Sequence, residues 1–78
     1  MIRGKVTGRV WSTKRIDTLP NGALLEVKVG TSTLVAFDPL GCAEGEEVLI
    51  TQGSVAAAYF TNIKAPVDAL IVGSVDAS

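Results

Sequence analysis

Residues 35–55 read VAFDPLGCAEGEEVLITQGSV, a stretch in which two strand-like runs flank a loop punctuated by glycine. Pro39 fixes its own φ and disfavours a helical conformation for Asp38, so the first run should end at Asp38. Gly41 and Gly45 bracket the loop, and glycine at such positions favours a positive φ or the close approach of another backbone. The stretch therefore predicts a strand, a tight loop and a second strand in direct succession.

Strand signals continue on both sides of this stretch. Strict alternation predicts a first strand over residues 2–11, with the even-numbered residues on the inner face and the odd-numbered residues on the outer face. Gly4 and Gly8 lie on the inner face, which indicates strong curvature or a close neighbouring backbone. After a polar connection over residues 12–23, we expect strands at 24–29, 33–38, 47–52 and 69–75, a hairpin turn at 30–32, a short helix at 54–60 capped by Ser54, and a loop at 61–66.

Five short strands and one small helix predict an all-β fold, a small five-stranded OB-like barrel that forms a single domain over residues 1–78. The last strand has too few polar residues for one wet face, so we expect it to be buried on both sides. In so small a domain the second cover should be another subunit. The candidate subunit-interface residues are Leu70, Ile71 and Val72.

Composition also favours an oligomer. The chain has 78 residues, 47% of them hydrophobic, and a positive mean hydropathy of +0.39. A domain of this size hides only ~60% of its unfolded surface and is marginally stable alone. One cysteine excludes an intramolecular disulfide, and the lack of histidine excludes an ordinary zinc site, so association with further copies is the remaining source of burial.

Charge and hydropathy limit the partners. The formal net charge is −1, with basic and acidic residues spread along the chain, so no polyanion-binding face is expected. The longest apolar run is far below the roughly 18 residues of a membrane span, and no signal-peptide core follows the first basic residues. We therefore expect a cytosolic protein with neither a membrane nor a nucleic-acid partner, in which Cys42 is an ordinary buried or loop thiol.

Catalytic chemistry is not expected. The usual proton shuttle, histidine, does not occur. Acidic residues cluster around the loop and are interpreted as a solvated rim rather than as a carboxylate pair or a cation site: Asp38, Glu44, Glu46 and Glu47. The two loop glycines are not followed by the Lys-Ser/Thr pair of a phosphate loop. The sequence thus predicts no enzyme, no catalytic residue, no cofactor and no metal.

One alternative stays open, a small OB-fold module that binds nucleic acid. Trp11, Tyr59 and Phe60 could form a base-stacking platform on such a barrel. Stacking platforms normally accompany a basic groove, whereas this chain is slightly acidic and has few aromatic residues. Packing in the core or at a subunit interface is the preferred interpretation of these rings.

Three separated motifs resemble one known family. The pattern Asp-x-x-Gly-x-x-x-Gly-Glu-x-Val-Leu begins at Asp38 and is followed by Gly-Ser-x-Ala-Ala from Gly53, while the chain opens with GKVTGRVWSTKRID and closes with PVDALIVGSVD. Together they look like the bacterial microcompartment vertex proteins, the EutN/CcmL-type pentamers. The sequence departs from the commonest pattern at Cys42, Ala43 and Ser74. These departures concern the subtype more than the family.

The resemblance implies a structural function in the cytoplasm. Such a protein is a cyclic homopentamer of five-stranded barrels that caps the vertices of a polyhedral shell built mainly from hexameric shell proteins. A flat hexagonal sheet cannot close without fivefold defects, and a pentamer supplies them. The type of microcompartment, carboxysome-like or catabolic, is not indicated.

The resemblance also implies two groups of site residues. The hexamer-facing rim would consist of Ser12, Thr13, Gly41, Cys42, Ala43, Val75 and Asp76. The turn placed near the fivefold axis, where a pore could run, would consist of Gly53, Ser54 and Val55.

Overall fold

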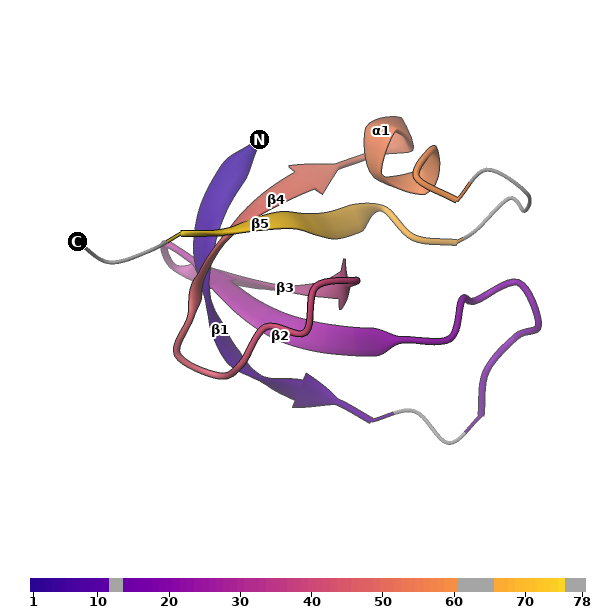
Figure 1. Cartoon of the computed structure of the whole chain (residues 1–78), viewed down its shortest axis with the longest axis horizontal. Coiled ribbons are helices and arrows are strands. Elements are labelled where there is room, and N and C mark those ends of the chain that lie inside the picture. Colours follow the sequence, from indigo (N-terminus) through magenta and orange to yellow (C-terminus); the bar gives the residue numbers. More distant parts are fainter. Residues whose placement is uncertain (12–13, 61–65, 76–78) are drawn as a thin grey trace.

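The computed structural model describes residues 1–11, 14–60 and 66–75. Within these ranges the chain forms a closed five-stranded barrel with one short helix (Figure 1). The elements in chain order are β1 (Ile2–Val10), β2 (Ala23–Val29), β3 (Ser32–Asp38), β4 (Glu47–Gln52), α1 (Ser54–Ala57) and β5 (Ala69–Val75). The predicted all-β barrel is confirmed, and every strand begins and ends within one residue of its expected bounds.

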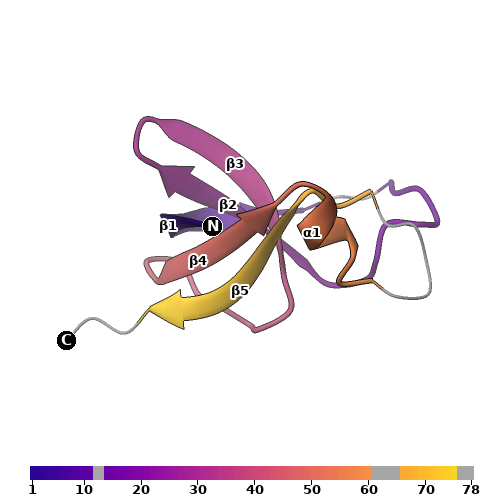
Figure 2. The ribbon, with the colours of Figure 1, turned by 90° about the horizontal axis from the view of Figure 1, so that it is seen from above.

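The strand order around the closed barrel is β1-β2-β3-β5-β4, and the long strand β1 pairs with both β2 and β4. Its first half pairs with β4, where Ile2 lies opposite Ile50, and its second half pairs with β2, where Val10 lies opposite Leu24. The β1–β2 register shifts between Val6 and Gly8, and such an irregularity bends a strand and increases its twist. Because β1 pairs with both strands, it lies between β2 and β4 (Figure 2).

The barrel interior is filled by the alternating apolar residues that the sequence placed on the inner faces. Valine and isoleucine dominate this core because branched side chains pack well on pleated strands. Its fully buried members are Val6, Leu25, Val27, Ala36, Val48, Ile50, Ala69 and Ile71.

At Gly4, β1 leaves no room for a side chain next to β2. A Cβ placed on Gly4 would lie 2.6 Å from Cγ1 of Val27 and 2.9 Å from the backbone oxygen of Lys28. The expected close approach of a neighbouring backbone is therefore confirmed at Gly4. At Gly8 a Cβ would meet nothing within 4 Å, so no backbone approaches closely there, and the register shift beside Gly8 agrees instead with the alternative expectation of strong curvature.

A second apolar cluster covers the seam between β3 and β5. These strands run parallel and share the single bridging pair of Phe37 and Leu70. The same two side chains pack with Ala56 of α1 and with Val67, and the ring of Phe60 meets Phe37 edge-on at 5.1 Å between centroids. The first half of β5 is thus covered on both faces by its own chain, so the expectation that another subunit covers Leu70 and Ile71 is wrong.

The helix is shorter than the predicted span of 54–60. Beyond Ala57, the amides of Tyr59 and Phe60 donate to the oxygens of Ala56 and Ala57, three residues back, which is a tightened final turn. The N-cap is Gly53 with φ 75°, and no side chain caps the helix, so the expected capping by Ser54 is wrong. In the described part of the chain no helix has the length and apolar character needed to cross a membrane.

Candidate functional site

The loop between β3 and β4 is organised by the buried carboxylate of Asp38. The side chain is only 4% exposed and accepts hydrogen bonds from the amides of Leu40 (2.9 Å) and Cys42 (2.6 Å). A short carboxylate that bonds the backbone two and four residues ahead fixes a tight turn. Asp38 is therefore not part of a solvated rim, and that part of the acidic-rim interpretation is wrong.

The far end of the loop is attached to β1. The amide of Gly45 donates to the oxygen of Val6 at 2.8 Å, and the amide of Val6 donates to the oxygen of Glu46 at 2.9 Å. Gly41 and Gly45 have φ values of 81° and 93°, a region that residues with a Cβ rarely adopt, so the expected positive φ is confirmed at both. The loop is held at both ends and presents Ala43 and Glu44 to solvent.

Two other acidic residues of this region, Glu46 and Glu47, have partners within the chain. Glu47 forms an exposed ion pair with Arg3, and Glu46 accepts a hydrogen bond from the hydroxyl of Ser74 at 3.0 Å. Residues 1–11, 14–60 and 66–75 contain no group of three or more His, Cys, Asp or Glu side chains that could hold a metal ion. The two contacts link β4 to β1 and the loop to β5.

Cys42 is half-buried and packs against the barrel core. Desolvation raises the pKa of its thiol to about 11, and the carboxylates of Asp38 and Glu46 add to the shift. The thiol is thus protonated at neutral pH. Because the thiolate is the nucleophile, this environment opposes covalent or redox chemistry.

We expect Cys42 in the folded chain to react with iodoacetamide about tenfold more slowly than in the denatured chain near neutral pH. The pKa in the folded state lies about two units above the ordinary value of 9.0, which lowers the thiolate fraction about a hundredfold, and the greater nucleophilicity of the more basic thiolate offsets part of this. The raised pKa also makes the free energy of unfolding depend on pH. The contribution of the thiol is fully present below pH 9.0 and is lost as the pH rises towards about 11, because ionisation is less favourable in the folded chain than in the unfolded chain.

The rate is measured by mass spectrometry of the alkylated chain with and without denaturant, and the stability effect should disappear in Cys42→Ala. Equal rates for the folded and denatured chains would show that the thiol is open to solvent.

The predicted rim residues lie only partly within the described chain. Gly41 and Ala43 are exposed, Cys42 is half-buried, and Val75 lies opposite Glu47 at the end of β5. Ser12, Thr13 and Asp76 lie outside the described residues. The assignment of these residues to one rim stays a prediction.

The turn predicted for the fivefold axis connects β4 to α1. The amide of Gly53 donates to the oxygen of Asp68 at 2.7 Å, which ties the turn to the start of β5, and Val55 projects outward with Ser54 exposed beside it. Figure 1 places α1 and the C-terminal end of β5 at opposite ends of the β4–β5 pair. The predicted axis and the Val75 part of the rim are thus separated along the molecule.

The three aromatic residues that could have formed a stacking platform do not lie together. Phe60 packs its ring edge-on against both Phe37 and Tyr59 and contributes to the second cluster. Trp11 follows the end of β1, which lies well away from α1 in Figure 1. The geometry of a continuous stacking surface is therefore absent from the described residues.

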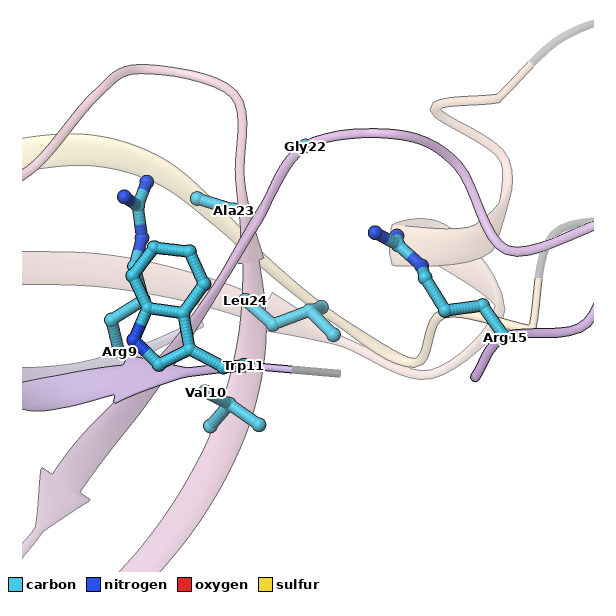
Figure 3. A pocket seen from close by; sticks show the side chains of 7 residues that line it. All are labelled: Arg9, Val10, Trp11, Arg15, Gly22, Ala23 and Leu24. Carbon is cyan, nitrogen blue, oxygen red and sulfur yellow. The ribbon is translucent and has the colours of Figure 1, made fainter. Parts of the chain in front are cut away.

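The sequence analysis missed a basic cavity of about 180 Å³ at the end of β1. It is lined by Arg9, Val10, Trp11, Arg15, Gly22, Ala23 and Leu24 (Figure 3). Arg9 lies on β1 and Trp11 directly follows its end, and the guanidinium carbon of Arg9 lies 5.1 Å from the centroid of the Trp11 ring. Arg15 could not be placed there from the sequence, because only the folded loop brings it to the start of β2.

Comparison with protein families identifies the chain. A family model described as "Ethanolamine utilisation protein EutN/carboxysome" matches residues 1–76. The chain belongs to this EutN/CcmL family. The resemblance of the three sequence motifs is thereby confirmed over nearly the whole chain.

Two characterised relatives of this EutN/CcmL member are shell proteins. The "Bacterial microcompartment shell vertex protein GrpN" of Rhodospirillum rubrum (strain F11) is 36% identical over 83 residues, which cover 97% of this chain and 93% of the relative. The "Carboxysome shell vertex protein CsoS4A" of Hydrogenovibrio crunogenus (strain DSM 25203 / XCL-2) is 41% identical over 75 residues, which cover 92% and 82% of the respective chains.

Solved structures of the family share the barrel. The pentameric shell protein MSM0273 from the RMM microcompartment superposes with a TM-score of 0.92 at 56% identity, over 97% of this chain and 91% of that one. The pentameric shell protein GrpN from Rhodospirillum rubrum superposes with a TM-score of 0.84 at 34% identity, over 99% and 95%. These family members do not favour the alternative of a nucleic-acid-binding module.

Proposed function

We propose that this chain is a vertex protein of a bacterial microcompartment shell, a homopentamer that closes the fivefold corners between hexameric shell proteins. The observation that supports it most strongly is the match to a pentameric shell protein at 56% identity over almost the full length of both chains. Five copies related by a closed rotation use head-to-tail interfaces, which form a ring when the angle between neighbours is right.

The surface of the single chain supports association. Large apolar side chains are exposed around a domain too small to bury them: Met1, Trp11, Ile16, Val35, Leu40, Val55, Tyr59 and Val72. Exposed apolar surface on a small domain typically marks contact with other chains. Of the residues predicted for the subunit interface, Val72 is available for it, with 42% of its surface exposed, whereas Leu70 and Ile71 are already buried.

The function is structural rather than enzymatic. The relatives are shell proteins, and Cys42, whose thiol is protonated at neutral pH, is not an activated nucleophile. The shell would lie in the cytoplasm. A role for Gly53, Ser54 and Val55 around a central pore belongs to the same proposal, because these residues are the exposed N-cap and first two residues of α1.

We expect the purified chain to be a homopentamer at micromolar concentration, and Val72→Asp to convert it into folded monomers. Val72 is exposed in the single chain, so the barrel tolerates a carboxylate there, whereas a charge buried between subunits costs several kcal/mol. Native mass spectrometry gives the mass of the assembly, and circular dichroism reports the fold. Val72→Thr, which has a similar shape and no charge, is the control and should remain pentameric. A monomeric wild-type chain would contradict the pentamer, and a pentameric Val72→Asp would remove Val72 from the interface.

The vertex role is tested by co-expression with the cognate hexameric shell protein and electron microscopy. We expect closed polyhedral shells with the wild-type chain and open or elongated assemblies with Ala43→Arg, because Ala43 lies on the exposed, well-anchored loop predicted to face the hexamers. An exposed substitution changes stability by only about 0.5 kcal/mol, so the variant should remain a pentamer.

Ala43→Ser, a small polar change at the same position, is the control and should close shells. Normal closure by Ala43→Arg would show that this loop does not face the hexamers. A wild-type chain that never enters a shell would refute the vertex role itself.

A further inference from the structure

The basic cavity at the end of β1 combines an exposed aromatic ring with two guanidinium groups. Trp11 is 79% exposed, and the Arg9 guanidinium is held over its ring by a cation–π contact. Figure 3 shows Arg15 on the other side of the Gly22–Leu24 segment from Arg9 and Trp11. Its Nη2 donates a hydrogen bond to the backbone oxygen of Pro20 at 2.5 Å. Both guanidinium groups are therefore partly positioned before any partner binds.

Among the described residues that line the cavity, none carries a negative charge to balance the two arginines. No carboxylate is among its lining residues, and in the described part of the chain the arginine that forms an ion pair is Arg3, not Arg9 or Arg15. Arginine and tryptophan are the side chains most enriched among residues that dominate binding energy at protein interfaces. The planar fork of arginine also matches a carboxylate better than any other basic group does.

Several of the chain's own carboxylates are already engaged within the chain and are less available to a second copy. Most of the acidic residues in the described part already accept hydrogen bonds or form an ion pair within the chain: Glu26, Asp38, Glu46 and Glu47. The cavity lies at the C-terminal end of β1, and the next residues in the sequence are Ser12 and Thr13, which were predicted to belong to the hexamer-facing rim. Charge complementarity and position together favour a carboxylate supplied by another protein of the shell.

We propose that the Arg9–Trp11–Arg15 cavity is the docking site for an acidic segment of the adjoining hexameric shell protein. The segment places a carboxylate between the two guanidinium groups and covers the exposed face of Trp11. This inference rests on the proposed vertex function and specifies which surface of the chain recognises the neighbouring hexameric shell protein.

The test measures how many copies of the chain are incorporated into shells. The chain is co-expressed with its tagged hexameric shell protein, shells are purified, and the ratio of the two proteins is quantified by mass spectrometry. We expect the double variant Arg9→Gln/Arg15→Gln to lower the ratio about tenfold or more, since it removes both charge partners. Trp11→Ala should lower it to a similar extent.

A matched control removes two positive charges from β1 and β2, outside the lining of the cavity. Lys5 and Lys28 are exposed and lie opposite each other in the β1–β2 register. The double variant Lys5→Gln/Lys28→Gln changes the net charge equally and should keep the wild-type ratio. If both double variants reduce incorporation alike, general charge is responsible and the docking site is refuted.

Further outcomes distinguish the other possible occupants. Native mass spectrometry should show intact pentamers for Arg9→Gln/Arg15→Gln, and dissociation would assign the cavity to contacts between copies of this chain and overturn the proposal. Trp11 is the only tryptophan, so its fluorescence in the purified chain reports on the cavity directly. No change is expected with single-stranded DNA at low salt, and a saturable change would make nucleic acid the occupant.

The incorporation experiment distinguishes an incorrect docking site from an incorrect vertex function. If the wild-type chain enters shells and Arg9→Gln/Arg15→Gln enters equally well, the docking site is wrong and the vertex function stands. If the wild-type chain does not enter shells, the vertex function fails, and the docking site that rests on it fails as well.

Discussion

Gly4→Ala should destabilise the barrel by about 3 kcal/mol, which for a domain of this size is a large part of its total stability. The added Cβ would lie 2.6 Å from Cγ1 of Val27 and 2.9 Å from the backbone oxygen of Lys28. Val27 is fully buried and the backbone oxygen belongs to the β1–β2 ladder, so neither can move without disturbing the core. The measurement is urea denaturation followed by circular dichroism.

Gly8→Ala is the matched control on the same strand. A Cβ on Gly8 meets nothing within 4 Å, so the substitution should change the unfolding free energy by at most about 0.5 kcal/mol. If Gly4→Ala unfolds at the same urea concentration as Gly8→Ala, then β1 and β2 do not approach each other as closely as described.

Asp38→Ala should reduce the unfolding free energy by about 2–4 kcal/mol, because it leaves two backbone amides without their acceptor. The amides of Leu40 and Cys42 both donate to this buried carboxylate. Asp38→Asn keeps one oxygen acceptor and should show a smaller loss. Amide hydrogen exchange at Leu40 and Cys42 should accelerate in both variants, since the turn loses its fixed conformation.

Glu44→Ala is the control for Asp38→Ala within the same loop. Glu44 is exposed, and its removal should change stability by no more than about 0.5 kcal/mol. Wild-type exchange rates in Asp38→Ala would show that the glycines alone define the loop, without its buried carboxylate.

The predictions for Gly4 and Asp38 concern the barrel and the glycine loop, and both of these are attached to β1. Its first half carries Gly4 and holds the barrel together, its middle anchors the glycine loop through Val6, and its end carries the Arg9–Trp11 part of the basic cavity. A shell vertex must present fixed surfaces to several neighbours at once. A single strand that links the core, the loop and the cavity supplies that rigidity.

Much of the fold could be predicted because the signals are local. Alternation along β1 and β2 assigned the inner and outer faces, and glycine with proline marked the ends of β3 and the loop that follows. Side-chain direction in a strand has a period of two, and only glycine occupies a positive φ without strain, so both features are read from neighbouring residues. The family motifs are equally local, and they identified the family.

The features that could not be predicted depend on contacts between residues distant in the sequence. Asp38 is buried because its loop folds back over the carboxylate, and Leu70 needs no second subunit because Phe37, Ala56 and Val67 cover it. The local sequence pattern does not indicate which distant residues will cover a given side chain.

The sequence by itself determined the barrel, its strands, the glycine loop and the family, because period-two alternation and backbone restrictions act over a few residues. Only the tertiary structure decided that Gly4 has no room for a side chain, that Asp38 is buried, and that Arg15 joins Arg9 and Trp11 at one cavity. Each of these depends on the register between strands and on the path of a loop, which are set by packing of the whole chain rather than by any single segment.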